Sequence, residues 1–143
     1  MIAGVAHVGI AVHSIDKARQ LYEALGLEIE TVEEVPEEQV RVAMIPCGAM
    51  HIELLEPTAP GSPIARFLET RGPGLHHLCL ASDGLDADDG ALRAAGYQRL
   101  RDVPTRGAGG CRVQFIHPKS ASGVLLELSE PPLPPPRSPE ATR

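Results

Sequence analysis

The sequence predicts an α+β fold made of two fused modules, each with the order strand, helix, strand, strand, strand. Two repeated segments carry this prediction. AHVGIAV at residues 6–12 returns as HLCLAS at residues 77–82, and IELLEP at residues 52–57 returns as LELSEP at residues 126–131. In each half, a helical stretch separates the first segment from the strands that follow. Such self-similarity is typical of a duplicated structural unit.

The first module is expected to cover residues 1–57. Residues 6–12 alternate between two kinds of side chain with the period of a strand. Ser14 can then cap a helix, and Gly26 can end it. The helix carries one apolar stripe, formed by Ile15, Ala18, Leu21, Tyr22 and Leu25. Three more strands are expected after this helix, and the last of them contains the IELLEP segment.

A connecting helix is expected within residues 58–73. Ser62 can cap it, Pro63 suits the first helical position, and Gly72 can end it. Ile64, Phe67 and Leu68 lie on one face of this helix. The segment therefore joins two modules and does not form a third.

The second module is expected to cover residues 74–130 and to repeat the order of the first. Its helix is a weaker one because Gly90 lies inside it, but it also ends at a glycine, Gly96. Residues 131–143 are rich in proline, which removes backbone donors from both helices and sheets. We expect this tail to be disordered.

Charge and composition argue for a small-molecule partner. The net charge is −6, so the chain lacks the basic surface that nucleic acids and anionic membranes attract. Aromatic residues make up only 3%, which leaves few side chains for stacking on bases. Cys47, Cys79 and Cys111 are widely spaced and odd in number, as in reduced core positions. With no signal-like or membrane-spanning run, a cytoplasmic protein is expected.

Strand periodicity brings four side chains to one face of the sheet. Alternate residues of a strand point to opposite faces, and these four all oppose the apolar residues that would pack under the helices. Two histidines and two glutamates in matching places suit a divalent ion, whereas a lone strand histidine or glutamate more often has a structural or solvent-facing role. The four candidate metal ligands are His7, Glu53, His77 and Glu127.

Other histidines compete for this site. His76 is adjacent to His77, and only one of two neighbouring strand residues is expected to face the metal. Matching His7 across the duplication selects His77. His51 shares a strand face with Glu53 and could support the ligands, while His13 and His117 read as structural or surface residues.

The chain resembles the vicinal oxygen chelate superfamily, and within it the methylmalonyl-CoA epimerase family, over about residues 2–130. The segments that carry the resemblance are HVGIAV, IELLEP, SPIARFLE, GLHHLCL and FIHPKSASGVLLEL. The resemblance implies a cupped mixed β-sheet around one divalent metal, with Co²⁺ first and Mn²⁺, Ni²⁺, Zn²⁺ or Mg²⁺ as alternatives. It also implies the same four ligands, a CoA thioester substrate and a homodimer.

The reaction implied is the interconversion of the two C2 epimers of methylmalonyl-CoA through an enolate. Glu127 would be one acid/base residue. Some members of the family carry a second glutamate on the third strand, where this chain has Val42, so Glu53 is expected to act as the opposing group. Lys119 and Ser120 are candidates for binding the substrate carboxylate or the CoA phosphates, although a solvated loop lysine is an equally good interpretation.

Two other functions fit the same pattern. One is a glyoxalase-type lyase acting on a glutathione hemithioacetal. The other is a metal-free binding or resistance protein built from the same modules, which would lack the ligand set. A ring-cleaving iron dioxygenase fits less well, because such sites usually have three protein ligands with a single carboxylate.

Overall fold

A computed structural model describes residues 1–132 of the chain. The elements along these residues are, in order, β1 (Ile2–Ala11), α1 (Ile15–Ala24), β2 (Thr31–Val35), η1 (Pro36–Glu38), β3 (Val40–Cys47), β4 (Met50–Pro57), α2 (Pro63–Arg71), β5 (Gly74–Ser82), α3 (Leu85–Ala94), β6 (Thr105–Arg106), η2 (Ala108–Gly110), β7 (Arg112–Ile116), η3 (Pro118–Ser120) and β8 (Leu126–Glu130). Most of the proline-rich tail expected from residue 131 lies outside the described residues.

The strands form one mixed sheet of eight, in the order β2-β3-β4-β1-β5-β8-β7-β6. Within each half, the first strand pairs in parallel with the last, β1 with β4 and β5 with β8. The halves join where β1 and β5 pair antiparallel. The predicted fold of two fused βαβββ modules is confirmed, and the modules pair within a single chain.

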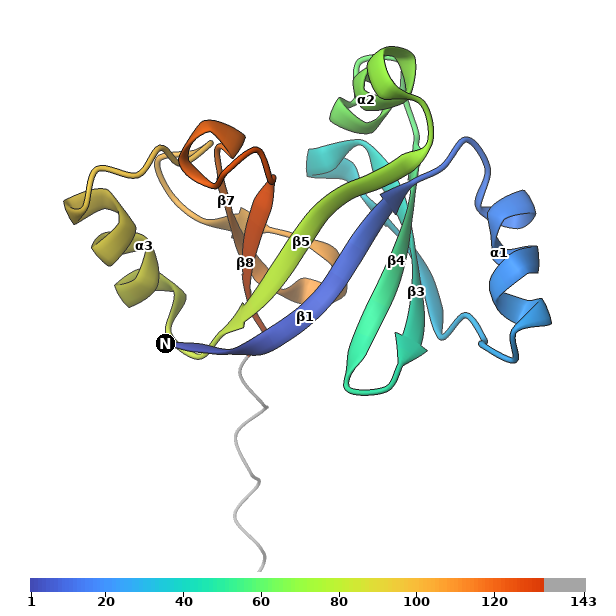
Figure 1. Cartoon of the computed structure of the whole chain (residues 1–143), viewed down its shortest axis with the longest axis horizontal. Coiled ribbons are helices and arrows are strands. Elements are labelled where there is room, and N and C mark those ends of the chain that lie inside the picture. Colours follow the sequence, from blue (N-terminus) through green and yellow to red (C-terminus); the bar gives the residue numbers. More distant parts are fainter. Residues whose placement is uncertain (133–143) are drawn as a thin grey trace, which may run out of the picture.

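The sheet curls (Figure 1), and residues of both of its halves line one hollow. Helices α1 and α3 lie on opposite flanks, and α2 lies at one end. Under α1 the core is built around Ile15, Ala43 and Leu54, and under α3 around Leu85 and Leu128. A further apolar cluster joins β3 and β4 to α2 through Val42, Leu55, Ile64 and Leu68. No helix among residues 1–132 is long and apolar enough to cross a bilayer.

The repeated hexapeptide explains how both outer helices begin. Its second glutamate accepts a hydrogen bond from the first backbone N–H of a helix, Glu56 from Ile15 and Glu130 from Leu85, at 3.3 and 3.2 Å. A carboxylate there satisfies a free N–H group and complements the positive end of the helix dipole. One glutamate of each hexapeptide thus serves the fold, which leaves the other, Glu53 or Glu127, for the hollow.

The side-chain caps expected for two helices are present. Ser14 accepts a hydrogen bond from the backbone N–H of Lys17, and Ser62 accepts one from Ala65. Helix α3 has Gly84 at its N-cap position and so lacks a side-chain cap. It is anchored instead by Asp89, which is buried beneath the helix and accepts hydrogen bonds from Arg99 and Gln114.

Candidate metal and active site

Four side chains from the four central strands meet in the hollow. His7 comes from β1, Glu53 from β4, His77 from β5 and Glu127 from β8. The strand register explains their meeting: Gly9 lies opposite both Glu53 and His77, and Cys79 lies opposite both Glu127 and His7. The second module therefore repeats the first about an approximate two-fold axis between β1 and β5.

Ligand atoms of His7, Glu53 and His77 lie within 4.8 Å of one another, and so do those of His7, Cys79 and Glu127, so His7 is common to two groups that could hold an ion. The Nε2 atom of His7 is 3.1 Å from Oε2 of Glu53, 3.2 Å from Oε2 of Glu127 and 2.9 Å from Nε2 of His77. The Nε2 atom of His77 is 2.8 Å from Oε2 of Glu127 and 3.9 Å from Oε2 of Glu53. The structure thus brings together all four residues that strand periodicity selects.

These separations fit an octahedral cation. Ligand bonds of about 2.1 Å place neighbouring ligands about 3 Å apart and opposite ligands about 4.2 Å apart. All four residues are at most 9% exposed. Two buried carboxylates that both approach Nε2 of His7 call for positive charge nearby. Two imidazoles and two carboxylates suit divalent ions of borderline to hard character.

The two carboxylates have different electrostatic surroundings. Burial raises the pKa of Glu127, but hydrogen bonds and charge from His7 and His77 outweigh burial and lower it to about 2. Burial also raises the pKa of Glu53, and the nearby histidines offset this only in part, so it stays above its usual value. Of the two, Glu53 holds a proton more readily.

The four residues lie at the wall of a cavity of about 340 Å³ whose other walls are mainly apolar. Strand pairing places Met44 beside Glu53 and Phe115 beside Glu127. Val42 also lines this cavity, so no carboxylate occupies that third-strand position. An apolar cavity with a few convergent polar groups is the usual form of a small-molecule site.

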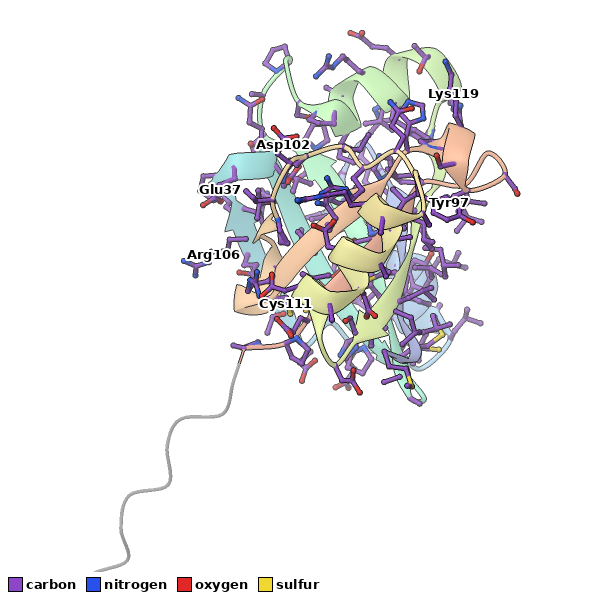
Figure 2. The ribbon with its side chains drawn as sticks, turned by 90° about the vertical axis from the view of Figure 1, so that its left-hand side faces the viewer. Glu37, Tyr97, Asp102, Arg106, Cys111 and Lys119 are labelled. Atoms are coloured by element: carbon purple, nitrogen blue, oxygen red, sulfur yellow. The ribbon has the colours of Figure 1, made fainter. Side chains whose placement is uncertain are left out.

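Two contacts between the modules close one side of the cavity. Arg101 of the second module pairs with Glu38 of the first, and the backbone N–H of Gly109 donates to Glu33. Glu38, in η1, itself lines the cavity. Periodicity did not predict these contacts, because they join irregular segments far apart in the sequence. Figure 2 views the molecule from the α3 side, and places Cys111 below Asp102.

The prediction that only His77, and not His76, faces the site is wrong in one respect. His76 also lines the cavity, and its Nδ1 atom lies 2.9 Å from Nδ1 of His77. Burial, together with the charge of His77, lowers the pKa of His76 to about 4. His51 lines the cavity as well, and its Nε2 atom lies 3.2 Å from Oε2 of Glu30.

The two predicted substrate-binding residues lie outside this cavity. Lys119 and Ser120 belong to η3, and Figure 2 shows Lys119 toward the end of the molecule where α2 lies. The Ser120 hydroxyl accepts a hydrogen bond from the backbone of Gln98, which gives it a structural role. The neighbouring Pro118 borders a second hollow of about 630 Å³, which shares His76 and His77 with the first.

Comparison with known proteins yields consistent matches. The family model of the glyoxalase/bleomycin resistance protein/dioxygenase superfamily matches residues 6–115. The ethylmalonyl-CoA/methylmalonyl-CoA epimerase of Cereibacter sphaeroides is 38% identical over 133 residues, covering 91% of this chain and 99% of the relative.

Solved structures of similar sequence share the fold. Methylmalonyl-CoA epimerase from Mycobacterium tuberculosis matches with a TM-score of 0.88 and 38% identity, covering 92% of this chain and 90% of that one. A variant of the Streptomyces coelicolor methylmalonyl-CoA epimerase, in complex with 2-nitronate-propionyl-CoA, matches with a TM-score of 0.89 and 36% identity, covering 93% and 100%.

Proposed function

Since the chain belongs to the glyoxalase/bleomycin resistance protein/dioxygenase superfamily, and within it to the methylmalonyl-CoA epimerases, we propose that it interconverts the two C2 epimers of methylmalonyl-CoA. The observation that carries this proposal is the meeting of two His/Glu pairs beside an apolar cavity. The substrate presents two oxygen donors, a thioester carbonyl and a carboxylate, on either side of the acidic C2–H. A site with one shared cation and two carboxylates suits that arrangement.

His7, Glu53, His77 and Glu127 would hold the metal, for which Co²⁺ is the first choice and Mn²⁺, Ni²⁺, Zn²⁺ or Mg²⁺ are alternatives. When bound, the ion would act as a Lewis acid and stabilise negative charge on the substrate oxygens. The burial of all four side chains supports this assignment, because it excludes competing water from the charges.

Glu127 and Glu53 would be the two acid/base groups, one removing the proton from C2 and the other returning a proton to it. Inversion at C2 requires one group to remove the proton from one face and another to return a proton to the opposite face. The approximate two-fold axis supports these roles, because it relates the two glutamates to each other across the β1–β5 junction. Val42 offers no acid/base group, which leaves Glu53 as the partner of Glu127.

The second hollow would take the CoA arm of the substrate. It adjoins the first at His76 and His77, and its walls include apolar residues such as Phe67, together with Arg66 and Arg71. A thioester held at the metal could therefore extend its pantetheine chain along α2. Lys119 remains a proposed contact for the CoA phosphates, and Ser120 a weaker one because its hydroxyl already accepts a bond from Gln98.

The homodimer and the cytoplasmic location stay predictions. A sedimentation measurement of the purified protein tests the first, and fractionation of the source cells tests the second.

Wash-out of deuterium from C2 tests the proposed reaction. Methylmalonyl-CoA labelled with deuterium at C2 should lose the label to water when the protein and a divalent metal are present. The Glu127→Gln variant should lose most of this activity while remaining folded. Absence of exchange with every divalent metal would refute the proposal, and turnover of methylglyoxal with glutathione would favour a lyase instead.

A further inference from the structure

Of the three irregularities in the pairing of β1 with β5, the two beside the histidines match each other. Val5 pairs with Leu80 and His7 pairs with Cys79, so one step along β5 faces two steps along β1. The extra residue is Ala6. On β5 the corresponding step runs from His77 to Leu75, which lie opposite Gly9 and Ile10. Each strand thus has one extra residue directly before its metal-site histidine. On β5 the extra residue is His76.

A β-bulge re-aims side chains that regular alternation would send to the other face. Ala6 and His76 both line the main cavity, as do His7 and His77, although each pair is adjacent in its strand. The two modules therefore use the same backbone device. In the first module the re-aimed residue has only a methyl group, and in the second it has an imidazole.

The imidazole of His76 is directed at one atom. Its Nδ1 lies 2.9 Å from Nδ1 of His77, and its ring packs edge-on against Phe67, with centroids 5.1 Å apart. His77 turns its other nitrogen, Nε2, toward Glu127 and His7. The two nitrogens of His77 thus have separate tasks, one toward the candidate metal site and one toward His76.

We propose that His76 is a positioning residue that accepts a hydrogen bond from Nδ1–H of His77 and so keeps the Nε2 lone pair of His77 available to the metal. A neutral imidazole carries one proton, and a proton on Nδ1 leaves Nε2 free to bind an ion. Ligating histidines commonly donate their second N–H to an outer partner, and loss of that partner typically weakens metal binding 10–100-fold. The inference rests on the proposed metal site and adds a residue to it.

Three variants separate positioning from structural support. His76→Ala copies the arrangement of Ala6 in the first module and should preserve the fold. His76→Asn places an amide oxygen near the position of Nδ1 and can accept the same hydrogen bond. His13→Ala removes an exposed histidine that lines neither cavity, as a control for non-specific metal binding.

Affinity for Co²⁺, measured by competition with a chromophoric chelator, tests the inference. We expect His76→Ala to bind about 10–100-fold more weakly than the parent protein, and His76→Asn and His13→Ala to bind within about threefold of it. In the Zn²⁺-loaded protein with ¹⁵N-labelled histidine, His77 should carry its proton on Nδ1 and His76 on Nε2.

Equal affinity of His76→Ala and the parent protein would overturn the inference and leave the proposed metal site standing. A proton on Nδ1 of His76 in the Zn²⁺-loaded protein would overturn it as well. If the parent protein bound no divalent ion at all, the proposed metal site and the inference would both be wrong.

Discussion

Gly9 provides the space that the ring of His77 occupies. A Cβ atom at Gly9 would lie 2.2 Å from Cε1 of His77 and 2.5 Å from its Nδ1, far inside van der Waals contact. Gly9 faces His77 across the β1–β5 junction, at the centre of the duplicated sheet. His77 of the second module can therefore take its position only because Gly9 of the first strand has no side chain.

The Gly9→Ala variant should weaken metal binding by at least about tenfold, because the added methyl group forces His77 out of the site. The same overlap should lower the free energy of unfolding by about 1–3 kcal/mol. Gly61→Ala is the matched control, since its Cβ would meet only Oε1 of Gln39 at 3.8 Å. Calorimetric titration with Co²⁺ and urea denaturation check both effects, and normal Co²⁺ affinity of Gly9→Ala would contradict the account.

Removing the charge of each glutamate should have opposite effects on the metal-free protein. The pKa of Glu127 is lowered to about 2 in the folded protein, so its ionised form stabilises the fold. This contribution is complete above the unfolded pKa of 4.5 and is lost as the pH falls toward 2. At pH 7 in the presence of a chelator, Glu127→Gln should lower the free energy of unfolding by about 3 kcal/mol, because the pKa falls from 4.5 to about 2 on folding.

The effect of the Glu53 charge on folding stability has the opposite sign. The pKa of Glu53 is raised, so its ionised form opposes folding, and this cost appears as the pH rises through the pKa of the folded state. Glu53→Gln should therefore stabilise the metal-free protein at pH 7 while still impairing metal binding. Urea denaturation with a chelator present measures both variants, and a shift of the same sign in both would show that the two environments do not differ as described.

Buried Asp89 should matter far more than Asp86, one turn earlier in α3. Asp89 is 4% exposed and accepts hydrogen bonds from Arg99 and Gln114, so Asp89→Ala leaves a nearly buried guanidinium without its partner. A loss of about 3–5 kcal/mol is expected. The side chain of Asp86 is 76% exposed and pairs with Arg112 at the surface, so Asp86→Ala should leave the free energy of unfolding almost unchanged. Similar unfolding midpoints in urea for the two variants would contradict this difference.

The part of the site that the sequence predicts is the part governed by strand periodicity. The two-residue repeat fixes the face of each side chain, and the duplication fixes which residues correspond, so His7, Glu53, His77 and Glu127 could be selected together. His76 could not be selected in this way, because a bulge changes the face of one residue without leaving a periodic pattern. The pair of adjacent histidines was the one available signal.

The sequence also does not indicate which irregular segments, far apart along the chain, contact each other. Glu38 falls in a turn by its local pattern, and nothing in that pattern indicates that Arg101 will reach it from the other module. The sequence predicts the role of the second glutamate of each hexapeptide only in part. Its recurrence was visible, but its use at the start of α1 and α3 depends on the way those helices cross the sheet.

One divalent ion, held by the four buried residues, should be required for proton exchange at C2. Titration of the chelator-treated protein with Co²⁺, while loss of the C2 deuteron from methylmalonyl-CoA is followed, measures this requirement. We expect no exchange without metal and a rate that rises in proportion to Co²⁺ up to one equivalent per chain. Full exchange in the metal-free protein, or a rate indifferent to added metal, would show that the ion is not required.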